Sequence, residues 1–217
     1  MLLRRGFLMI HRGDDLSFSE RLREAERFHM GTGSVHETLR QLAADLDREK
    51  IDYAIIGGMA LNAHGYRRET IDVDVLVRPE GLERFRDELV GRGYRPKFEG
   101  AKKEFRNTTT NIPVEFITTG EFPGDGKPKP VAFPDPAAKS IDAEGIRVID
   151  LATLIELKLA SGMTQPSRLR DLADVQDLIR TLRLTCKFID QLHPYVHESF
   201  DALCSNLDGS DTDTKSD

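Results

Sequence analysis

The sequence predicts an α/β fold, in which short strands and amphipathic helices alternate, followed by a C-terminal helical segment. Two observations predict it. Short runs of β-branched and aromatic residues bounded by glycine or proline are typical of strands, and the segments between them place apolar residues at helical spacing. The length of 217 residues suits one compact domain with a helical appendage.

The central stretch, residues 53–77, combines both patterns. The apolar run Tyr53–Ile56 predicts a strand, the Gly-Gly pair after it predicts a tight turn, and the Ala- and Leu-containing segment that follows predicts a short helix. A second strand comes next, with Asp72 and Asp74 on one face because side chains alternate across a strand. Its other face is predicted to carry Ile71, Val73, Val75 and Val77.

Asp72 and Asp74 are unusual in a strand, since aspartate is depleted there and two like charges on one face, roughly 7 Å apart, repel. A divalent cation between them would remove the repulsion. Mg²⁺ is typically held by one or two protein carboxylates, with substrate phosphates and water completing its shell. The alternative interpretation is a half-exposed strand whose outer face carries acids without a ligand.

The glycine pair, Gly57 and Gly58, suggests a phosphate cradle. Glycine lets the backbone approach a ligand closely, and the helix after the turn directs free N–H groups and its positive dipole end at a phosphate. A phosphate cradle followed closely by a metal-binding pair predicts a nucleoside triphosphate bound with Mg²⁺. An ordinary turn between strand and helix is the alternative.

The pattern G-G-x-A followed by R-x-T-x-D-x-D resembles the nucleotidyltransferase superfamily. It looks most similar to the small bacterial members, which include the toxins of abortive-infection toxin–antitoxin pairs. The resemblance covers residues 51–117 well and residues 148–179 loosely. It implies a nucleotidyltransferase-like short mixed sheet with helices packed on it.

The resemblance also implies a site with two Mg²⁺ ions, Mn²⁺ being an alternative, and an NTP substrate. The glycine turn would hold the triphosphate, and a third carboxylate on a later strand would complete the metal pair. A lysine in the later helix would reach the triphosphate, although a lysine snorkelling from a buried helix explains it equally well. The implied catalytic and metal-binding residues are Asp72, Asp74 and Glu115, and the implied nucleotide-binding residues are Gly57, Gly58, Arg68 and Lys158.

The chain departs from the family pattern at three positions. Gly58 stands where many active members have serine, and Glu115 stands where aspartate is usual. Pro113 precedes Glu115 by two residues and is more typical of an edge strand than of a central one. The alternative interpretation of Glu115 is therefore an exposed charge on an edge strand.

The remaining elements follow from capping and periodicity. Ser34 with Glu37 forms a predicted capping box at the start of an amphipathic helix. Further helices are predicted at 82–91, 151–160, 168–175 and 188–207, and further strands at 103–106, 112–118 and 145–149. The predicted organisation is an N-terminal arm and helix (1–33), a nucleotidyltransferase-like core (34–149), a C-terminal helical segment (150–207) and a disordered tail (208–217).

Two segments of the core have less regular composition. Residues 92–106 carry six basic against two acidic side chains, which would suit an RNA or a nucleotide phosphate, but a solvated strand edge guarded by lysines is the more common explanation. Residues 121–136 hold half of the ten prolines and have no periodicity, so they are predicted to form a surface loop. A plain connector is favoured over a cover for the site. Asp171 and Asp174 are expected to lie on a helix surface or to pair between helices, and not to bind a metal.

Composition excludes several classes of protein. The net charge of −6 gives no global basic field for nucleic acid, and no stretch approaches the length of a membrane span. The two cysteines, Cys186 and Cys204, make neither a disulfide framework nor a zinc signature, and reduced thiols are the expected state. Because the apolar part of the N-terminal segment is too short for a signal peptide, a cytoplasmic location is expected.

The sequence thus predicts a Mg²⁺-dependent nucleotidyltransferase that moves a nucleoside monophosphate from an NTP to a hydroxyl of RNA, protein or a small molecule. A toxin-like role with an antitoxin protein as partner lies within the resemblance. Two alternatives remain: a catalytically silent module of the same fold that binds a nucleotide or a partner, and a chain whose acids are surface residues and which only pairs with a neighbour.

Overall fold

The computed structural model describes residues 23, 25 and 27–210, with side chains through residue 205. Most of the predicted N-terminal arm, and residues 211–217 of the predicted disordered tail, lie outside these residues; residues 208–210 of that tail instead belong to the helix His197–Ser210. No helix in the described ranges is both long enough and apolar enough to cross a membrane.

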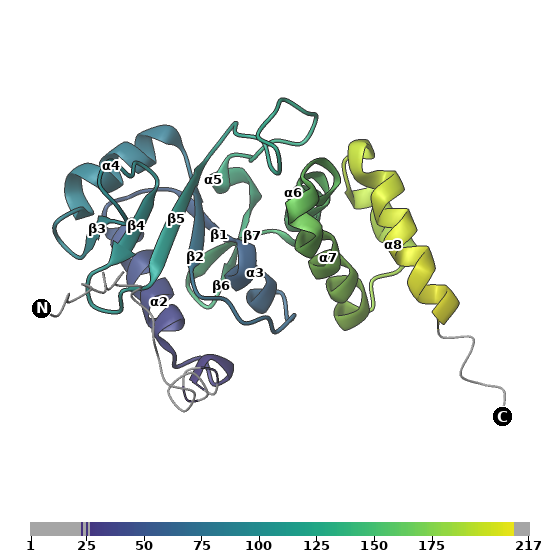
Figure 1. Cartoon of the computed structure of the whole chain (residues 1–217), viewed down its shortest axis with the longest axis horizontal. Helices are drawn as coiled ribbons and strands as arrows, with labels where there is room; N and C mark the ends of the chain where they lie inside the picture. Colours follow the sequence, from purple (N-terminus) through teal and green to yellow (C-terminus); the bar gives the residue numbers. More distant parts are fainter. Residues whose placement is uncertain (1–22, 24, 26, 211–217) are drawn as a thin grey trace, which may run out of the picture.

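The described chain forms a mixed sheet of the order β3-β4-β5-β2-β1-β7-β6 (Figure 1). β2 pairs with β5 and β1 pairs with β7 in parallel, and the other neighbours are antiparallel. The predicted α/β fold with a mixed sheet is therefore confirmed. The strands are β1 (Tyr53–Ile56), β2 (Val73–Val77), β3 (Tyr94–Pro96), β4 (Glu104–Asn107), β5 (Pro113–Thr118), β6 (Ser140–Ala143) and β7 (Ile146–Ile149).

One face of the sheet packs on α2 (Ser34–Arg48) and α4 (Pro79–Leu89). Alternation places Val75 and Phe116 on this face, and α4 turns its apolar side, with Phe85, towards them. The Phe85 ring lies 4.3 to 5.1 Å from the ring centroids of Phe116, Tyr94 and Phe105. This aromatic cluster holds β3, β4 and β5 against α4.

The C-terminal helices form a separate layer at the far end of the sheet from β3 and β4 (Figure 1). They are α6 (Leu151–Thr164), α7 (Leu169–Leu182) and α8 (His197–Ser210), with short 3₁₀ turns between them. α6 begins as predicted, because the Asp150 side chain accepts a hydrogen bond from the Thr153 N–H. α6 is apolar nearly all round and packs mainly along α7, with α8 also against it.

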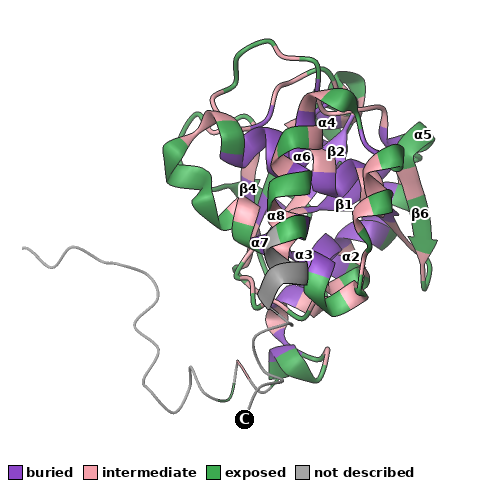
Figure 2. Cartoon of the chain, turned by 90° about the vertical axis from the view of Figure 1, so that its right-hand side faces the viewer, coloured by how far each residue is buried: buried purple, intermediate pink, exposed green. Residues whose placement is uncertain are grey.

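Burial is deepest in β1 and β2 at the centre of the sheet, whereas β6 forms an exposed edge (Figure 2). The helix α3 (Gly57–Ala63) follows β1 directly and packs beside β2. The order strand, glycine pair, short helix, strand is therefore confirmed. A four-residue helix, α5 (Pro136–Lys139), and the short strands β3 and β6 were not predicted.

Several predictions at element ends were wrong. The capping box does not form, because Gly33 and not Ser34 is the N-cap of α2, and no side chain caps the helix. Ile71 does not share the core face with Val73; it precedes β2, and 76% of its side chain is exposed. Pro113 does not mark an edge strand, because it is the first residue of a strand that lies between β4 and β2, where a missing N–H is tolerated.

The cysteines also differ from the prediction of reduced thiols. Cys186, in the 3₁₀ turn Cys186–Gln191, and Cys204, on α8, form a disulfide with their Cα atoms 5.7 Å apart. The turn folds back along α8, and the Phe188 ring lies 6.1 Å from that of Phe200. This packing brings two cysteines 18 residues apart in sequence to bonding distance.

Candidate active site

A cleft of about 230 Å³ lies between the open face of the sheet and the helices α6 and α7. The sheet contributes the ends of β1, β2 and β5, and the helices contribute mainly polar and charged groups. A further wall of the cleft is formed by mainly apolar residues of the connection after β5. The polar residues that line it are Asp74, Glu115, Glu121, Lys158, Ser161, Arg168 and Asp171.

Gly57 and Asp74 meet at the bottom of the cleft. Asp74 pairs with Ile56 across β1 and β2, so its carboxylate lies over the start of α3. A Cβ built on Gly57 would stand 1.9 Å from an Asp74 carboxylate oxygen, and Gly57 has φ of +62°. Both the close approach and the left-handed backbone therefore require glycine at position 57. The structure brings the predicted turn and the predicted acid together.

Gly58 makes a second close approach, to Thr70. A Cβ on Gly58 would stand 2.7 Å from the Thr70 Cβ and 2.9 Å from its hydroxyl. That hydroxyl donates a 2.6 Å hydrogen bond to the Asp72 carboxylate. Thr70 therefore fills the space that a side chain at position 58 would need, which explains why this chain has glycine there. The same contact orients Asp72, one residue before β2.

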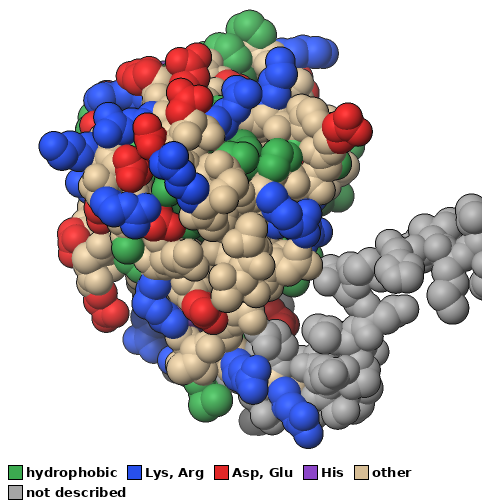
Figure 3. Space-filling view, turned by 90° about the vertical axis from the view of Figure 1, so that its left-hand side faces the viewer, with side chains coloured by type: hydrophobic (Ala, Val, Ile, Leu, Met, Phe, Trp, Pro, Cys, Tyr) green, Lys and Arg blue, Asp and Glu red, His purple; other side chains and the backbone are tan. Residues whose placement is uncertain are grey.

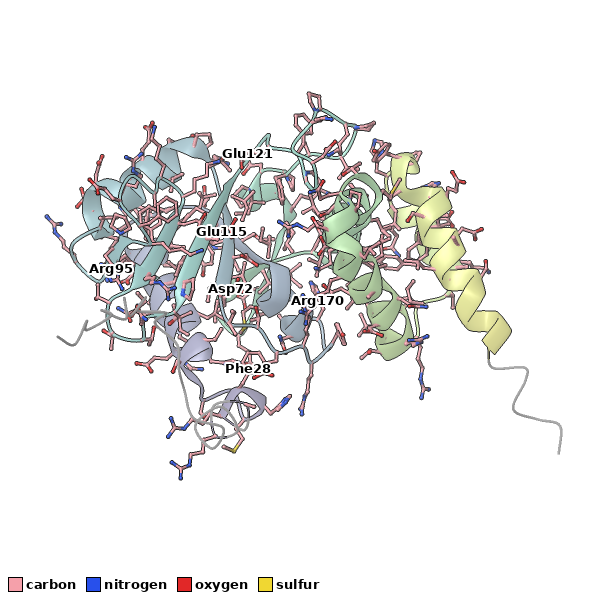
Figure 4. The ribbon with its side chains drawn as sticks, in the orientation of Figure 1. Phe28, Asp72, Arg95, Glu115, Glu121 and Arg170 are labelled. Carbon is pink, nitrogen blue, oxygen red and sulfur yellow. A yellow bond between two sulfur atoms is a disulfide. The ribbon has the colours of Figure 1, made fainter. Side chains whose placement is uncertain are left out.

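Glu115 lies on the strand next to the aspartates. The register pairs Asp74 of β2 directly with Glu115 of β5, on strands about 4.8 Å apart, and both residues face the cleft. Glu115 is thus on a central strand at the site and not on a sheet edge. Asp72 and Glu115 are both labelled in Figure 4.

Burial and neighbouring charges raise the pKa values of Asp74 and Glu115. Burial, then the charge of Asp72 and then that of Glu115 raise the pKa of Asp74 to about 7. Desolvation at the cleft wall, then Glu104 and then Asp72 raise the pKa of Glu115. Within the described chain, no group donates a hydrogen bond to the Asp74 or Glu115 carboxylate. Acids in a cleft whose pKa values are raised by burial and by neighbouring charges are characteristic of functional sites.

The carboxylates of Asp72 and Asp74 together suit a Mg²⁺ ion. The described residues contain no group of three or more His, Cys, Asp or Glu side chains that could hold a metal ion by themselves. Mg²⁺ needs only one or two carboxylates when phosphates and water complete its shell, and Asp72 and Asp74 supply two. Glu115 lies one strand away, at the position paired with Asp74.

Lys158 and Arg68 are both tied to α7. Lys158 is 8% exposed, and its Nζ lies 2.9 Å from an Asp171 oxygen and 2.7 Å from an Asp174 oxygen. The Arg68 guanidinium lies 2.8 Å from that same Asp174 oxygen. Ser161 completes the cluster by donating to Asp171. The two aspartates pair between helices as predicted, Lys158 lines the cleft, and Arg68 lies behind it.

Arg168 was not predicted as a site residue. It lies in the turn between α6 and α7, lines the cleft, and has no carboxylate partner within the described chain. Its charge lowers the proton affinity of both Asp74 and Glu115. The signal was present in Arg168-Leu169-Arg170-Asp171, but periodicity alone does not show which cation of a helical turn faces the sheet.

The connection after β5 walls the cleft, contrary to the expectation of a plain connector. Phe122, Pro123, Gly124 and Phe133 line it. A Cβ on Gly124 would stand 2.3 Å from the Thr164 hydroxyl and 2.8 Å from the Ser161 carbonyl oxygen, so the loop docks on α6 at a glycine. The Lys129 side chain, 5% exposed, donates to Asp125 and holds the loop together.

No protein-family model matches the chain, and no curated protein matches it. Several solved structures are similar in fold. A putative nucleotidyltransferase from Thermotoga maritima aligns with a TM-score of 0.43 and 21% identity, covering 76% of this chain and 99% of that one. ANT(2″)-Ia in complex with adenylyl-2″-tobramycin aligns with a TM-score of 0.48 and 14% identity, covering 78% and 97%.

An antigenic nucleotidyltransferase-like protein from Paracoccidioides brasiliensis aligns with a TM-score of 0.46 and 15% identity, covering 82% of this chain and 88% of that one.

Proposed function

We propose that the chain is a Mg²⁺-dependent nucleotidyltransferase that transfers a nucleoside monophosphate from an NTP to an acceptor hydroxyl. One observation carries the proposal. Asp74 and Glu115 are held opposite each other on adjacent strands, beside Asp72, and within the described chain neither has a hydrogen-bond donor. Gly57, whose backbone lies close to the Asp74 carboxylate, lines the same cleft.

The chain's own groups divide the work between binding and proton transfer. The N–H groups at the start of α3 and the Arg168 guanidinium face the cleft and would bind the triphosphate. Asp72 and Asp74 would hold Mg²⁺, which supplies Lewis-acid neutralisation of charge on the phosphoryl oxygens. The connection after β5 would exclude water from one side of the cleft.

The reaction balances with these groups. The acceptor oxygen forms a bond to the α-phosphorus as the bond from that phosphorus to the bridging oxygen of the β-phosphate breaks. Pyrophosphate leaves with the electron pair. The hydroxyl proton passes to the Glu115 carboxylate, whose raised pKa makes it a better proton acceptor than an ordinary glutamate. Catalysis of this type is mostly alignment and charge neutralisation.

The test is transfer of label from each α-labelled NTP, with Mg²⁺, to total cellular RNA, protein and a panel of small hydroxyl compounds. Label should appear in one acceptor fraction with the parent chain and fall at least a hundredfold with Asp72→Asn/Asp74→Asn. Asp87→Asn/Asp201→Asn, which removes the same charge from exposed surfaces of α4 and α8, is the matched control. Equal labelling by parent and site variant would refute the proposal.

A catalytically silent nucleotide- or partner-binding module is the second candidate. The observation that favours it is the pairing of both Lys158 and Arg68 with α7 carboxylates, which leaves them less available to a triphosphate. Equilibrium dialysis with labelled ATP separates the candidates. Mg²⁺-dependent binding without transfer to any acceptor class would favour the silent module.

A toxin-like role with an antitoxin partner is a finer proposal within the same activity. It predicts that inducing the parent chain in a bacterial host arrests growth, and that the Asp72→Asn/Asp74→Asn variant, expressed to the same level, does not. Growth unaffected by the parent chain would count against the toxin role and leave the transfer activity open.

A further inference from the structure

The half of the sheet formed by β3, β4 and β5 has an uncovered face. Alternate residues of these strands are buried against α4, while those between them are exposed or half-buried. The uncovered face is the one that carries Glu115, so it continues directly from the cleft. In Figure 4 it runs from Asp72 and Glu115 towards Arg95, and the ribbon of no described helix crosses it.

The strand registers arrange this face in two rows of side chains perpendicular to the strands. The first row contains Asp74, Glu115 and Glu104, which occupy paired positions on β2, β5 and β4. Lys97, just after β3, ends the row with a 2.5 Å ion pair to Glu104. This row is acidic next to the cleft and neutralised at its far end.

The second row is basic. Pro113 of β5 pairs with Arg106 of β4, and Arg106 pairs with Arg95 of β3. Asp72 directly precedes β2 at the end of the sheet where this row begins. With strands about 4.8 Å apart, the backbones at Arg106 and Arg95 lie roughly 10 and 14 Å from that of β2. The row therefore leads straight away from the metal-binding pair.

Arg95 and Arg106 are not neutralised by the protein. Within the described chain neither forms an ion pair, and both donate instead to Asn111: Arg95 to its side-chain oxygen at 2.9 Å and Arg106 to its carbonyl oxygen at 2.7 Å. Two like charges directly opposite on neighbouring strands are destabilising. An anion lying across both would remove that cost, and guanidinium groups suit phosphate oxygens.

The wider surface does not explain the pair. On the side of the molecule that carries β3 and α4, Lys and Arg are interspersed with Asp and Glu, with no continuous basic surface (Figure 3). The net charge is −6. The two arginines are thus a local arrangement, and Phe98, 57% exposed just after β3, places an aromatic ring at the end of the same strand. Phosphate-binding cations with an exposed aromatic are the usual elements of single-strand binding.

We propose that the acceptor is a single-stranded nucleic acid whose terminal hydroxyl lies at Asp72 and Asp74 and whose next phosphates lie across Arg106 and Arg95. This rests on the proposed function, because it names the acceptor class of the same site. The acidic row positions the hydroxyl and the basic row holds the strand behind it. A cationic acceptor that approached along the second row would meet Arg106 and Arg95.

Binding is measured first, without NTP, by fluorescence anisotropy of a labelled ten-nucleotide single strand, in RNA and DNA forms of one sequence. Arg95→Gln/Arg106→Gln should weaken binding at least tenfold and lower the salt slope of log K by about 1.4, or 0.7 per lost phosphate contact. The matched control Arg84→Gln/Arg86→Gln removes the same charge from α4 on the opposite face and should leave both unchanged. Arg95→Lys/Arg106→Lys should retain most of the affinity.

The outcomes separate this inference from the proposed function. Strand binding that depends on Arg95 and Arg106 and survives in Asp72→Asn/Asp74→Asn supports the acceptor surface even if no label is transferred. Transfer of label to protein or to a small molecule, unchanged in Arg95→Gln/Arg106→Gln, would uphold the transferase and overturn the acceptor class. No strand binding by the parent chain, or equal loss in the α4 control, would also overturn it.

Discussion

Asp74 is a site residue whose burial lowers the folding stability of the metal-free protein when its carboxylate is charged. Its pKa is raised from 3.8 to about 7, first by burial and then by the charges of Asp72 and Glu115. Between these values the folded chain keeps a proton that the unfolded chain has lost. The free energy of unfolding of the metal-free protein is therefore greatest, with respect to this group, below pH 4 and falls as pH rises through 7.

We expect Asp74→Asn to remove this dependence. Three pKa units correspond to about 4 kcal/mol at most, so the metal-free variant should exceed the parent in stability by up to that amount at pH 8 and match it near pH 4. Urea unfolding from pH 4 to pH 9 in the presence of a chelator measures the difference. Parallel stability curves for parent and variant would contradict the raised pKa.

We expect replacement by alanine to have different consequences at Gly57 and at Gly58. Gly57→Ala meets the Asp74 carboxylate and a positive φ, so no neighbouring side-chain change can fully relieve it. Gly58→Ala meets only the Thr70 side chain. We expect thermal melting to show both single variants destabilised by roughly 1–3 kcal/mol, with Thr70→Gly recovering much of the loss for Gly58→Ala and none for Gly57→Ala. Equal recovery at both positions would refute this assignment.

At the residue scale the sequence predicted the two aspartates and the glycine turn because their spacing is local. Glu115 was identified only by resemblance, and the register Asp74–Glu115 confirms that the two acids are neighbours. Arg168 was missed because its position depends on how α7 packs on α6. No pattern in the sequence shows which face of the turn between them meets the sheet.

At the element scale, α6 and α7 are joined by a buried charge cluster. Lys158 lies between Asp171 and Asp174, and Asp174 also holds Arg68 from the segment before β2. A buried ion pair adds little when intact but costs much when one partner is removed. The cluster therefore fixes the position of α7, and of Arg168 at its start, relative to the cleft.

We expect Lys158→Met to destabilise the chain by about 3 kcal/mol, because it leaves the Asp171 and Asp174 charges only partly compensated. Lys158→Met/Asp171→Asn should recover part of this loss, since one carboxylate no longer needs a cation. Urea unfolding measures both, with Arg170→Gln on the exposed side of α7 as control. A loss confined to NTP affinity, with stability unchanged, would instead make Lys158 a nucleotide ligand and not a structural one.

Element boundaries were predicted correctly where a local cap or a short apolar run marks them, as at Asp150 and in β1. The predictions were wrong where tertiary contacts determine the local structure. The connection after β5 looked like a plain linker because proline and glycine suppress periodicity, yet Gly124 docks on α6 and Lys129 is buried within the loop. β3 and β6 were missed because their sequences, Tyr-Arg-Pro and Ser-Ile-Asp-Ala, contain no apolar run typical of a strand.

At the scale of the whole molecule, the disulfide is the feature on which sequence reasoning failed. Two cysteines 18 residues apart, with no framework of others, gave no signal for pairing. Their proximity depends on the 3₁₀ turn at Cys186 folding back along α8, with Phe188 near Phe200. Only the folded C-terminal segment reveals it.

The disulfide closes a loop of 18 residues, which in the chain-entropy description stabilises the folded state by about 3 kcal/mol. We expect Cys186→Ser/Cys204→Ser to lower the denaturation midpoint accordingly and to make amide exchange in α8 faster, while exchange in β1 and β2 changes less. Because the cleft is lined by the sheet, α6 and the start of α7 and not by α8, Mg²⁺-dependent ATP binding should be retained. A reductant should reproduce the variant in the parent chain and have no effect on the variant itself. If the variant lost nucleotide binding together with amide protection in α8, the C-terminal helices and the site would unfold as one unit. The site would then depend on the folded layer of C-terminal helices.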